Sequence, residues 1–147
     1  ATAPSGLGPK APSVSLLGSG AILCEVVKAA ALLAEQGIAA EVFSITSWSE
    51  LARDGLRTEQ AAMAHEKSPV AFVTSLLAEH KGPVIAATDY VRAVPESIRA
   101  YLPQSRRYIT LGTDGFGRSD TRQELRSFFN VDAASIVSAA IFALEKN

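Results

Sequence analysis

Apolar residues along this chain alternate between short unbroken runs and longer stripes with helical spacing. The first run, Val14–Leu17, is followed by Gly18-Ser19-Gly20 and then by apolar positions three and four residues apart, from Ile22 to Ala34. Gly37 follows the last turn of that stripe, where a left-handed C-terminal cap favours glycine. The pattern predicts a strand, a glycine turn and a helix.

Three later apolar runs, at 42–45, 84–88 and 106–111, have the length of strands. The run at 84–88 is apolar almost throughout, which is typical of a strand covered on both faces of a parallel sheet. Strands that alternate with helices predict an α/β domain with a mainly parallel sheet and helices on both faces. Helices are expected at 47–53, 58–65, 70–80, 95–101, 121–129 and 133–146, with Pro69 opening the third, Asn130 ending the fifth and Asp132 starting the last.

The strand at 106–111 leads into a loop that carries three glycines between Gly112 and Gly117. A surface loop with an aromatic ring, an arginine and carboxylates can be a contact site. Its polar side chains can instead satisfy the backbone of a tight turn. The candidate contact residues are Asp114, Phe116, Arg118, Ser119 and Asp120.

Residue types in this loop argue against a metal site and against catalysis. Phe116 and Arg118 occupy positions at which an EF-hand needs oxygen ligands. The planar guanidinium of Arg118 can bind a carboxylate or a phosphate, or it can bridge to Asp120 or to a neighbouring domain. No nucleophile or base stands beside it.

Other candidate sites are incomplete. Gly18-Ser19-Gly20 lacks the third glycine of a dinucleotide-binding turn, because Leu23 stands in that position, and it fits a tight strand-to-helix turn. His65 and His80 lie far apart and lack the spacing of metal ligands. We therefore expect no catalytic, cofactor-binding or metal-binding residue in this chain.

Composition indicates one folded domain. The 147 residues are 48% hydrophobic and 20% charged, and the net charge of −1 gives no basic field for nucleic acid or an anionic membrane. No apolar run approaches the roughly 20 residues of a membrane span. The single cysteine, Cys24, excludes a disulfide framework within the chain and is expected in the core, in a reducing compartment. Residues 1–12 are expected to be a linker, and 13–147 a domain of a longer protein.

Four stretches, Leu16–Leu23, Glu41–Gly55, Ala87–Tyr90 and Leu111–Asp120, resemble one family in the order in which they occur. That family is the C-terminal domain of the homodimeric first component of bacterial pyruvate dehydrogenase complexes. More distantly, the chain is similar to the C-terminal domains of transketolases. The likeness covers nearly all of the chain from Ser13 onward.

The resemblance implies a mixed sheet of about five strands, one of them antiparallel, between helices. It implies a bacterial, cytoplasmic parent enzyme that decarboxylates pyruvate and reductively acetylates the lipoyl group of the dihydrolipoyl acetyltransferase. Other domains of that homodimeric parent would bind thiamine diphosphate and magnesium and hold the catalytic residues. The domain itself would be non-catalytic, and would dock on those domains and support the dimer.

Two alternatives stay open at the level of sequence. The domain can be a regulatory or partner-binding module that holds a small anion or the acetyltransferase at the loop 112–120. It can also be a free-standing nucleotide-binding protein, for which Gly18-Ser19-Gly20 is the only support.

Overall fold

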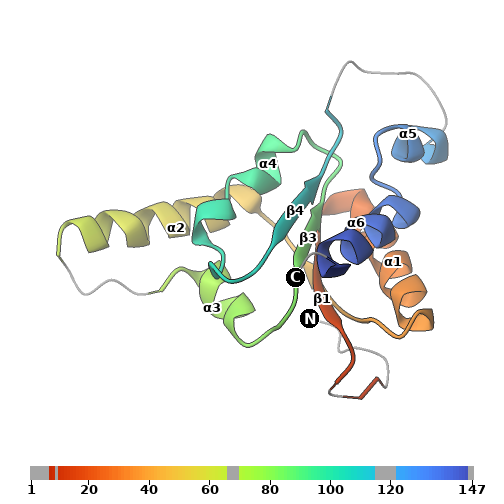
Figure 1. Cartoon of the computed structure of the whole chain (residues 1–147). Helices are drawn as coiled ribbons and strands as arrows, with labels where there is room; N and C mark the ends of the chain where they lie inside the picture. The colour runs from red at the N-terminus through yellow and green to blue at the C-terminus, as the bar shows by residue number, and fades with distance from the viewer. Residues whose placement is uncertain (1–6, 9, 66–69, 115–121, 146–147) are drawn as a thin grey trace.

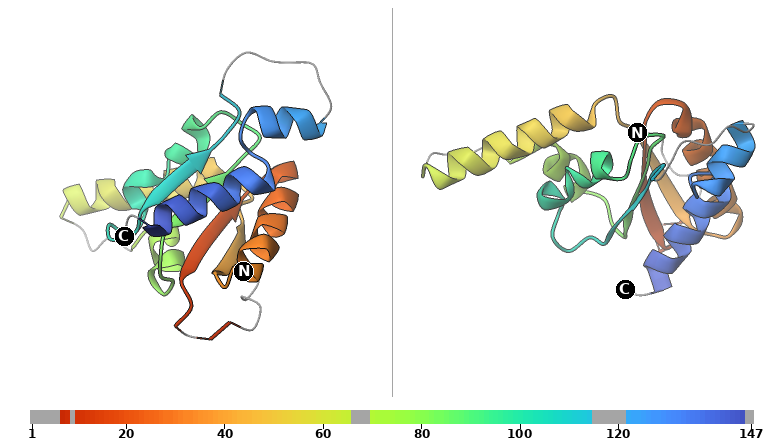
Figure 2. Two further views of the ribbon diagram at one scale, coloured as in Figure 1. Left: turned by 45° about the vertical axis from the view of Figure 1, so that its right-hand side comes forward. Right: turned by 90° about the horizontal axis from the view of Figure 1, so that it is seen from above.

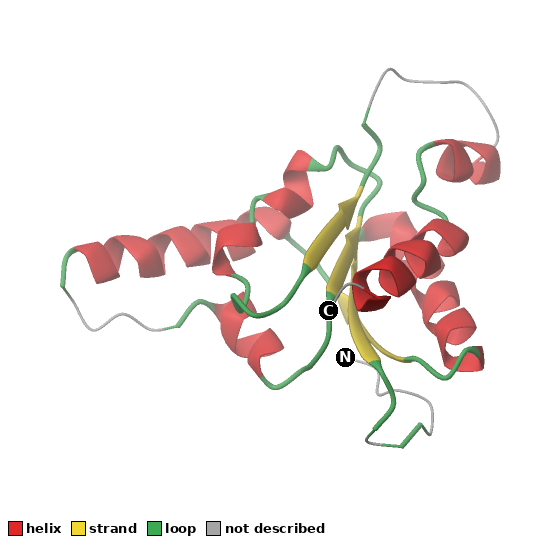
Figure 3. Cartoon of the chain, viewed as in Figure 1, coloured by secondary structure: helices red, strands yellow, loops and turns green. Residues whose placement is uncertain are grey.

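The computed structural model describes residues 7–8, 10–65, 70–114 and 122–145. At its centre lies a parallel four-stranded sheet in the order β2-β1-β3-β4, with helices on both faces (Figures 1 and 3). This architecture confirms the predicted α/β class. The strands are β1 (Ser13–Gly18), β2 (Ala39–Ser44), β3 (Val84–Ala87) and β4 (Tyr108–Leu111).

β1 is the central strand and pairs with β2 on one side and with β3 on the other. Leu16 lies opposite Val42 of β2 and Ile85 of β3, and Ile85 in turn lies opposite Ile109 of β4. Every residue of β3 is buried, as are all residues of β1 after Ser13. Burial on both faces explains why these strands are continuous apolar runs instead of alternating patterns.

One face of the sheet is covered by α1 (Leu23–Glu35), which follows the 3₁₀ turn η1 (Gly20–Ile22), and by α6 (Ala133–Glu145). The strands contribute alternate side chains to this face, because successive residues point to opposite sides of a sheet. The shared core includes Val14, Leu16, Ile85, Val26, Ala29, Leu33, Ile136 and Ala140.

The other face is covered by α2 (Trp48–Met63), α3 (Phe72–Ala78), α4 (Ala93–Glu96) and the 3₁₀ turn η2 (Arg99–Tyr101) (Figure 2). Its core includes Leu17, Phe43, Trp48, Leu77, Val84, Ala86, Ile98 and Tyr108. A further helix, α5 (Arg122–Phe128), lies next to α1 and α6.

α2 is one continuous helix, whereas the sequence predicted two helices at 47–53 and 58–65. The predicted gap between 53 and 58 is therefore wrong, and it contains Gly55, a residue that is costly inside a helix. Gly55 is needed for close packing, because a Cβ there would lie 2.1 Å from Cδ2 of Tyr101. Two predicted helix ends are confirmed. Gly37 after α1 has φ +75° and Asn130 after α5 has φ +55°, so both adopt the left-handed conformation that ends a helix.

Two helices on the second face differ from their predicted extents. α3 covers Phe72–Ala78 instead of 70–80, and Pro69 lies outside the described residues. The helix predicted at 95–101 is divided into α4 and η2, with Pro95 inside α4. Asp132 starts α6 as predicted, since its Oδ1 accepts a hydrogen bond from the Ser135 N–H at 2.9 Å.

Two expectations about strand number and burial need correction. About five strands were expected, one of them antiparallel, but the described residues form four strands that are all parallel, because helical crossovers join them. Cys24 was expected in the core but is exposed. It lies on the outer side of α1, whose buried stripe contains Val26, Ala29 and Leu33.

The stretch Glu124–Glu145 is long and apolar enough, by composition, to cross a membrane. It is not one helix, because α5 and α6 are separated by the left-handed residue Asn130. Four residues of α6 are buried in the domain, which accounts for its apolar composition as a core helix: Ile136, Val137, Ala140 and Ala143.

Candidate functional site

The four stretches that carry the family resemblance meet at one end of the sheet. Each contains all or the start of a turn that follows a strand: 18–20 after β1, 45–49 after β2, 88–92 after β3 (of which the stretch covers 88–90) and 112–114 after β4. The carboxyl ends of parallel strands lie at the same edge, so these turns form one surface, which we call the carboxyl-end surface. Ligands of open α/β sheets bind at this edge, where the strand order reverses. Here the reversal lies between β1 and β3.

The turn after β1 is packed tightly against α1 and β3. A Cβ on Gly18 would lie 2.8 Å from Cγ2 of Val26, and Gly20 has φ +54°, which favours glycine. Ser19 is buried, and its Oγ lies 3.1 Å from Oγ1 of Thr88 at the end of β3. This geometry supports the interpretation of Gly18-Ser19-Gly20 as a structural turn that joins β1 to β3.

The turn after β4 is fixed to the turn after β3 by three hydrogen bonds. The Thr113 N–H donates to the Tyr90 carbonyl at 2.9 Å, and the Thr113 hydroxyl donates to the Asp89 carbonyl at 2.8 Å. The Arg92 N–H donates to Oδ1 of Asp114 at 2.8 Å. Gly112 is required at this junction, because a Cβ there would lie 2.8 Å from the Arg92 nitrogen and the Tyr90 oxygen.

Asp114 is therefore a structural residue of the surface as well as a predicted contact residue. One of its oxygens accepts the Arg92 N–H, and the other lies 3.8 Å from Nε of Arg92, with the side chain 53% exposed. The other predicted contact residues lie outside the described residues: Phe116, Arg118, Ser119 and Asp120.

A hollow of about 410 Å³ lies between the turns after β1, β2 and β3. At its edge, Ser47 caps α2 by accepting the Glu50 N–H at 3.2 Å. Trp48 forms part of its wall and is 4% exposed, and the Trp48 indole N–H has no hydrogen-bond partner among the described residues. The hollow is lined by Ser19, Gly20, Ile45, Thr46, Ser47, Trp48, Ser49, Tyr90 and Val94.

Two large apolar side chains on the carboxyl-end surface face solvent. Tyr90 is 63% exposed and Val91 is 50% exposed. They stand beside polar groups of the same turns, and apolar patches with a polar rim mark interaction sites. No sequence pattern marks Tyr90, Val91 or Trp48 individually as contact residues. The spacing of Ser47 and Glu50, which is that of a capping box, was the available signal that α2 starts beside this surface.

Glu25 of α1 holds α5 and α6 in place beyond the loop. Its carboxylate accepts hydrogen bonds from Nη1 of Arg126 at 2.9 Å, from Nζ of Lys28 at 3.0 Å and from the Ala133 N–H at 3.3 Å. Burial raises the pKa of Glu25, but the Lys28 and Ala133 hydrogen bonds and the two positive charges outweigh it, so that the pKa is lowered.

Glu96 of α4 supports β4, the strand that leads into the loop. Nε and Nη2 of Arg99 donate to its two oxygens at 2.6 and 2.7 Å, and the Thr110 hydroxyl also donates to it. The Arg99 guanidinium stacks 4.9 Å above the Tyr108 ring. The hydrogen bonds from Arg99 are the largest cause that lowers the pKa of Glu96 to about 2, against the effect of burial.

The described residues offer no metal centre, since no three His, Cys, Asp or Glu side chains among them could hold an ion together. His80 pairs with Glu41 and packs edge-on against Phe43, with 5.1 Å between ring centroids. His65 ends α2 with φ +58°. Neither histidine belongs to the carboxyl-end surface, whose described side chains mainly tie its turns together.

Comparison with known families shows the class to which this fold and surface belong. Residues 4–132 match the family described as the transketolase-like TK C-terminal domain, and the chain belongs to that family.

Within this family, the chain is most informatively compared with three pyruvate dehydrogenase E1 components. The chain is 47% identical over 141 residues to the pyruvate dehydrogenase E1 component of Mycolicibacterium smegmatis, which covers 94% of this chain and 15% of the relative. It is 50% identical over 134 residues to the E1 component of Pseudomonas aeruginosa, and this match covers 89% of this chain and 15% of the relative. It is 45% identical over 136 residues to the E1 component of Escherichia coli K12, and this match covers 90% of this chain and 15% of the relative. The chain thus spans about 15% of the length of these relatives.

Solved structures agree at the level of fold. A split-gene transketolase, described as an inactive beta4 tetramer, matches with a TM-score of 0.59 and 20% identity over 92% of this chain and 40% of its own. Transketolase from Leishmania mexicana matches with a TM-score of 0.57 and 18% identity, over 95% of this chain and 17% of its own.

Proposed function

We propose that this chain is the C-terminal domain of a pyruvate dehydrogenase E1 component and docks on the other domains of that enzyme through its carboxyl-end surface. The observation that carries the proposal is the 45–50% identity to three E1 components along about nine tenths of the chain. The parent enzyme would decarboxylate pyruvate and reductively acetylate the lipoyl group of the dihydrolipoyl acetyltransferase. It would do so as a homodimer in the bacterial cytoplasm.

A docking role fits the chemistry of the surface better than a catalytic role does. Asp114, Thr113, Ser19 and Thr88 use their polar atoms to join neighbouring turns. Such joined turns present a rigid surface, and rigid surfaces lose little entropy on binding. Exposed Tyr90 contributes an apolar anchor of the kind that is enriched in interfaces.

In this proposal thiamine diphosphate and magnesium belong to the other domains of the parent, as the family resemblance implies. Among the described residues, no three His, Cys, Asp or Glu side chains lie together where they could hold the cation. Decarboxylation would depend on this chain only through the assembly of the enzyme.

Substitution of the anchor in the full-length enzyme tests the docking role. Tyr90→Glu with Val91→Glu should make the C-terminal domain more susceptible to limited proteolysis and weaken the dimer, because buried carboxylates without partners are costly. Val27→Glu on α1, at a residue with 53% exposure, is the matched control. Unchanged proteolysis and dimerisation in the Tyr90/Val91 variant would contradict docking through this surface.

Arg118→Ala separates docking from the alternative of a partner-binding module. Under the proposal, the variant weakens dimerisation or domain docking. Normal decarboxylation combined with lost assembly with the acetyltransferase would favour the alternative.

A further inference from the structure

The distal half of α2 projects away from the sheet (Figures 1 and 2). It carries apolar side chains that are exposed to solvent. Leu56 is 45% exposed and Met63 is 67% exposed. They are seven residues apart, which is two helical turns, so they share a face of α2. Where the described chain resumes before α3, Val70 is 65% exposed and Phe72 is 60% exposed. We call these four residues the α2–α3 ridge.

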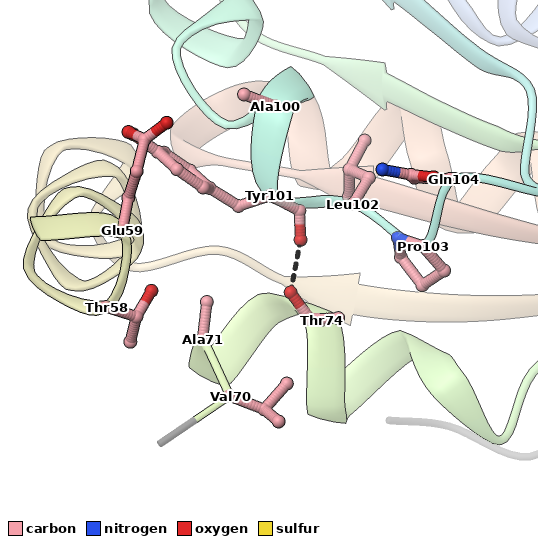
Figure 4. Close-up of a pocket in the computed structure, with 10 residues that line it drawn as sticks. All are labelled: Thr58, Glu59, Val70, Ala71, Thr74, Ala100, Tyr101, Leu102, Pro103 and Gln104. Atoms are coloured by element: carbon pink, nitrogen blue, oxygen red, sulfur yellow. Dashed lines mark hydrogen bonds between the residues drawn. The ribbon is translucent and has the colours of Figure 1, made fainter. Parts of the chain in front are cut away.

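Hollows lie on both sides of the point where α3 packs on α2. One, of about 370 Å³, lies between α2, α3 and η2, with Val70, Thr58 and Tyr101 in its lining (Figure 4). The other, of about 430 Å³, lies between the end of β2, α2 and α3, with Phe72 and Leu51 in its lining. A partner of complementary shape can fill such hollows and cover the exposed apolar side chains beside them.

The ridge is continuous with the carboxyl-end surface. The hollow beside Phe72 and the hollow beside Tyr90 share Ile45, Thr46 and Ser47 in their linings. These residues form the turn from β2 into α2, so the start of α2 belongs to the carboxyl-end surface and its far end belongs to the ridge. A partner that covers the turn from β2 into α2 can therefore contact Phe72 of the ridge as well as Tyr90 of the carboxyl-end surface.

We propose that the α2–α3 ridge docks against an apolar groove in the preceding domains of the same enzyme chain; this inference rests on the function proposed above. The matched region is about 15% of each E1 relative, so the rest of such a chain is long enough to form domains that cover the ridge. A specific interface buries at least about 1,000 Å² in total, and Tyr90 and Val91 alone are too few to supply it. The ridge adds four exposed apolar anchors, two on α2 and two at or just before the start of α3.

Covalent linkage favours a neighbour in the same chain over a free partner. A tethered domain meets its partner at a millimolar effective concentration, so a modest apolar ridge is enough for stable docking. Charged side chains surround the ridge with both signs, as in the polar rim of an interface that must stay soluble before assembly. They include Glu50, Arg53, Asp54 and Arg57 on α2.

Hydrogen exchange on the full-length enzyme and on this 147-residue chain tests the inference. Amides of 56–63 and 72–78 should exchange at least about tenfold more slowly in the full-length enzyme, because docking removes local opening of an exposed helix. Equal exchange at the ridge, with protection at 89–92 and 112–114, would overturn this inference and leave the proposed function standing. Equal exchange at both places would overturn both. Protection at the ridge that depends on enzyme concentration would show that a second copy covers it, and would also overturn the inference.

Charged variants provide the second measurement. Met63→Lys with Phe72→Lys should abolish the protection of the ridge amides in the full-length enzyme. In the isolated chain both side chains already face solvent, so its Tm should change by no more than about 2 °C. Val27→Lys with Leu32→Lys, on the opposite face of the sheet, is the control and should leave the ridge protected. If the double variant unfolds the isolated chain, Met63→Lys alone replaces it. Retained protection in the ridge variant would refute the docking of this surface.

Discussion

At the scale of single residues, Glu96 connects α4 to the strand that leads into the carboxyl-end surface. It receives two hydrogen bonds from Arg99 and one from Thr110 of β4. Charge-assisted pairs of this bidentate kind are among the stronger polar interactions. The ionised form of Glu96 therefore stabilises the folded chain.

The pH dependence of stability should report this interaction. The pKa of Glu96 is about 2 in the folded chain, against an ordinary value of 4.5. Because the folded pKa is depressed, the stabilisation is present above pH 4.5 and is lost as the pH falls towards 2. Glu96→Gln should cost about 1–2 kcal/mol at pH 7, and the difference from the parent chain should vanish near pH 2. Urea unfolding at several pH values measures it, and a pH-independent difference would contradict this account.

At the scale of elements, α2 is held to the domain by close packing at Gly55. Tyr101 of η2 lies where a side chain at position 55 would stand. Phe72 at the start of α3 donates its backbone N–H to Oδ2 of Asp54 at 2.7 Å. These two contacts explain how the first half of α2 is fixed while its far end projects.

Gly55→Ala should show that packing outweighs helix propensity. In an open helix the change would stabilise by about 1 kcal/mol. Here the Tyr101 ring must move, and we expect destabilisation by about 1–3 kcal/mol. In a Tyr101→Ala background the same change should become stabilising, which a double-mutant cycle on thermal or urea unfolding can measure. A stabilising Gly55→Ala in the parent chain would mean that the contact is easily displaced.

Local sequence patterns predicted the strands and most helices because each carries its own signal. The apolar runs at 14–17 and 84–88 mark buried parallel strands, and Asp132 carries a cap that the structure confirms. The gap predicted between 53 and 58 was wrong, and the packing that holds this part of α2, Gly55 against Tyr101, joins residues far apart in the chain. The prediction for Cys24 was wrong because a helix exposes some apolar positions, and Glu25 beside it is buried through partners on α5 and α6.

The candidate site was predicted only in part for the same reason. The loop 112–120 was found from its residue types, but the meeting of four turns depends on strand order. The sequence does not reveal that order, so Tyr90 and Val91 were not recognised as neighbours of Asp114. Thr113 and Gly112 show the link, since both contact the turn after β3.

At the scale of the whole molecule, the domain is asymmetric. One face of the sheet is closed by α1 and α6, whereas the other side carries the projecting α2 (Figure 2). The carboxyl-end surface includes the start of α2 and the α2–α3 ridge includes its far half, and both expose large apolar side chains. A domain with this distribution is suited to packing against a larger body, which agrees with its 15% share of the E1 relatives.

Complementation in trans tests most directly whether this chain is a docked domain of an E1 enzyme. An E1 chain truncated before this domain is produced alone, and the 147-residue chain is added while binding and pyruvate decarboxylation are measured. We predict a one-to-one complex and decarboxylation that rises with added domain. A folded truncated enzyme that decarboxylates pyruvate at the full rate and does not bind the domain would contradict the account.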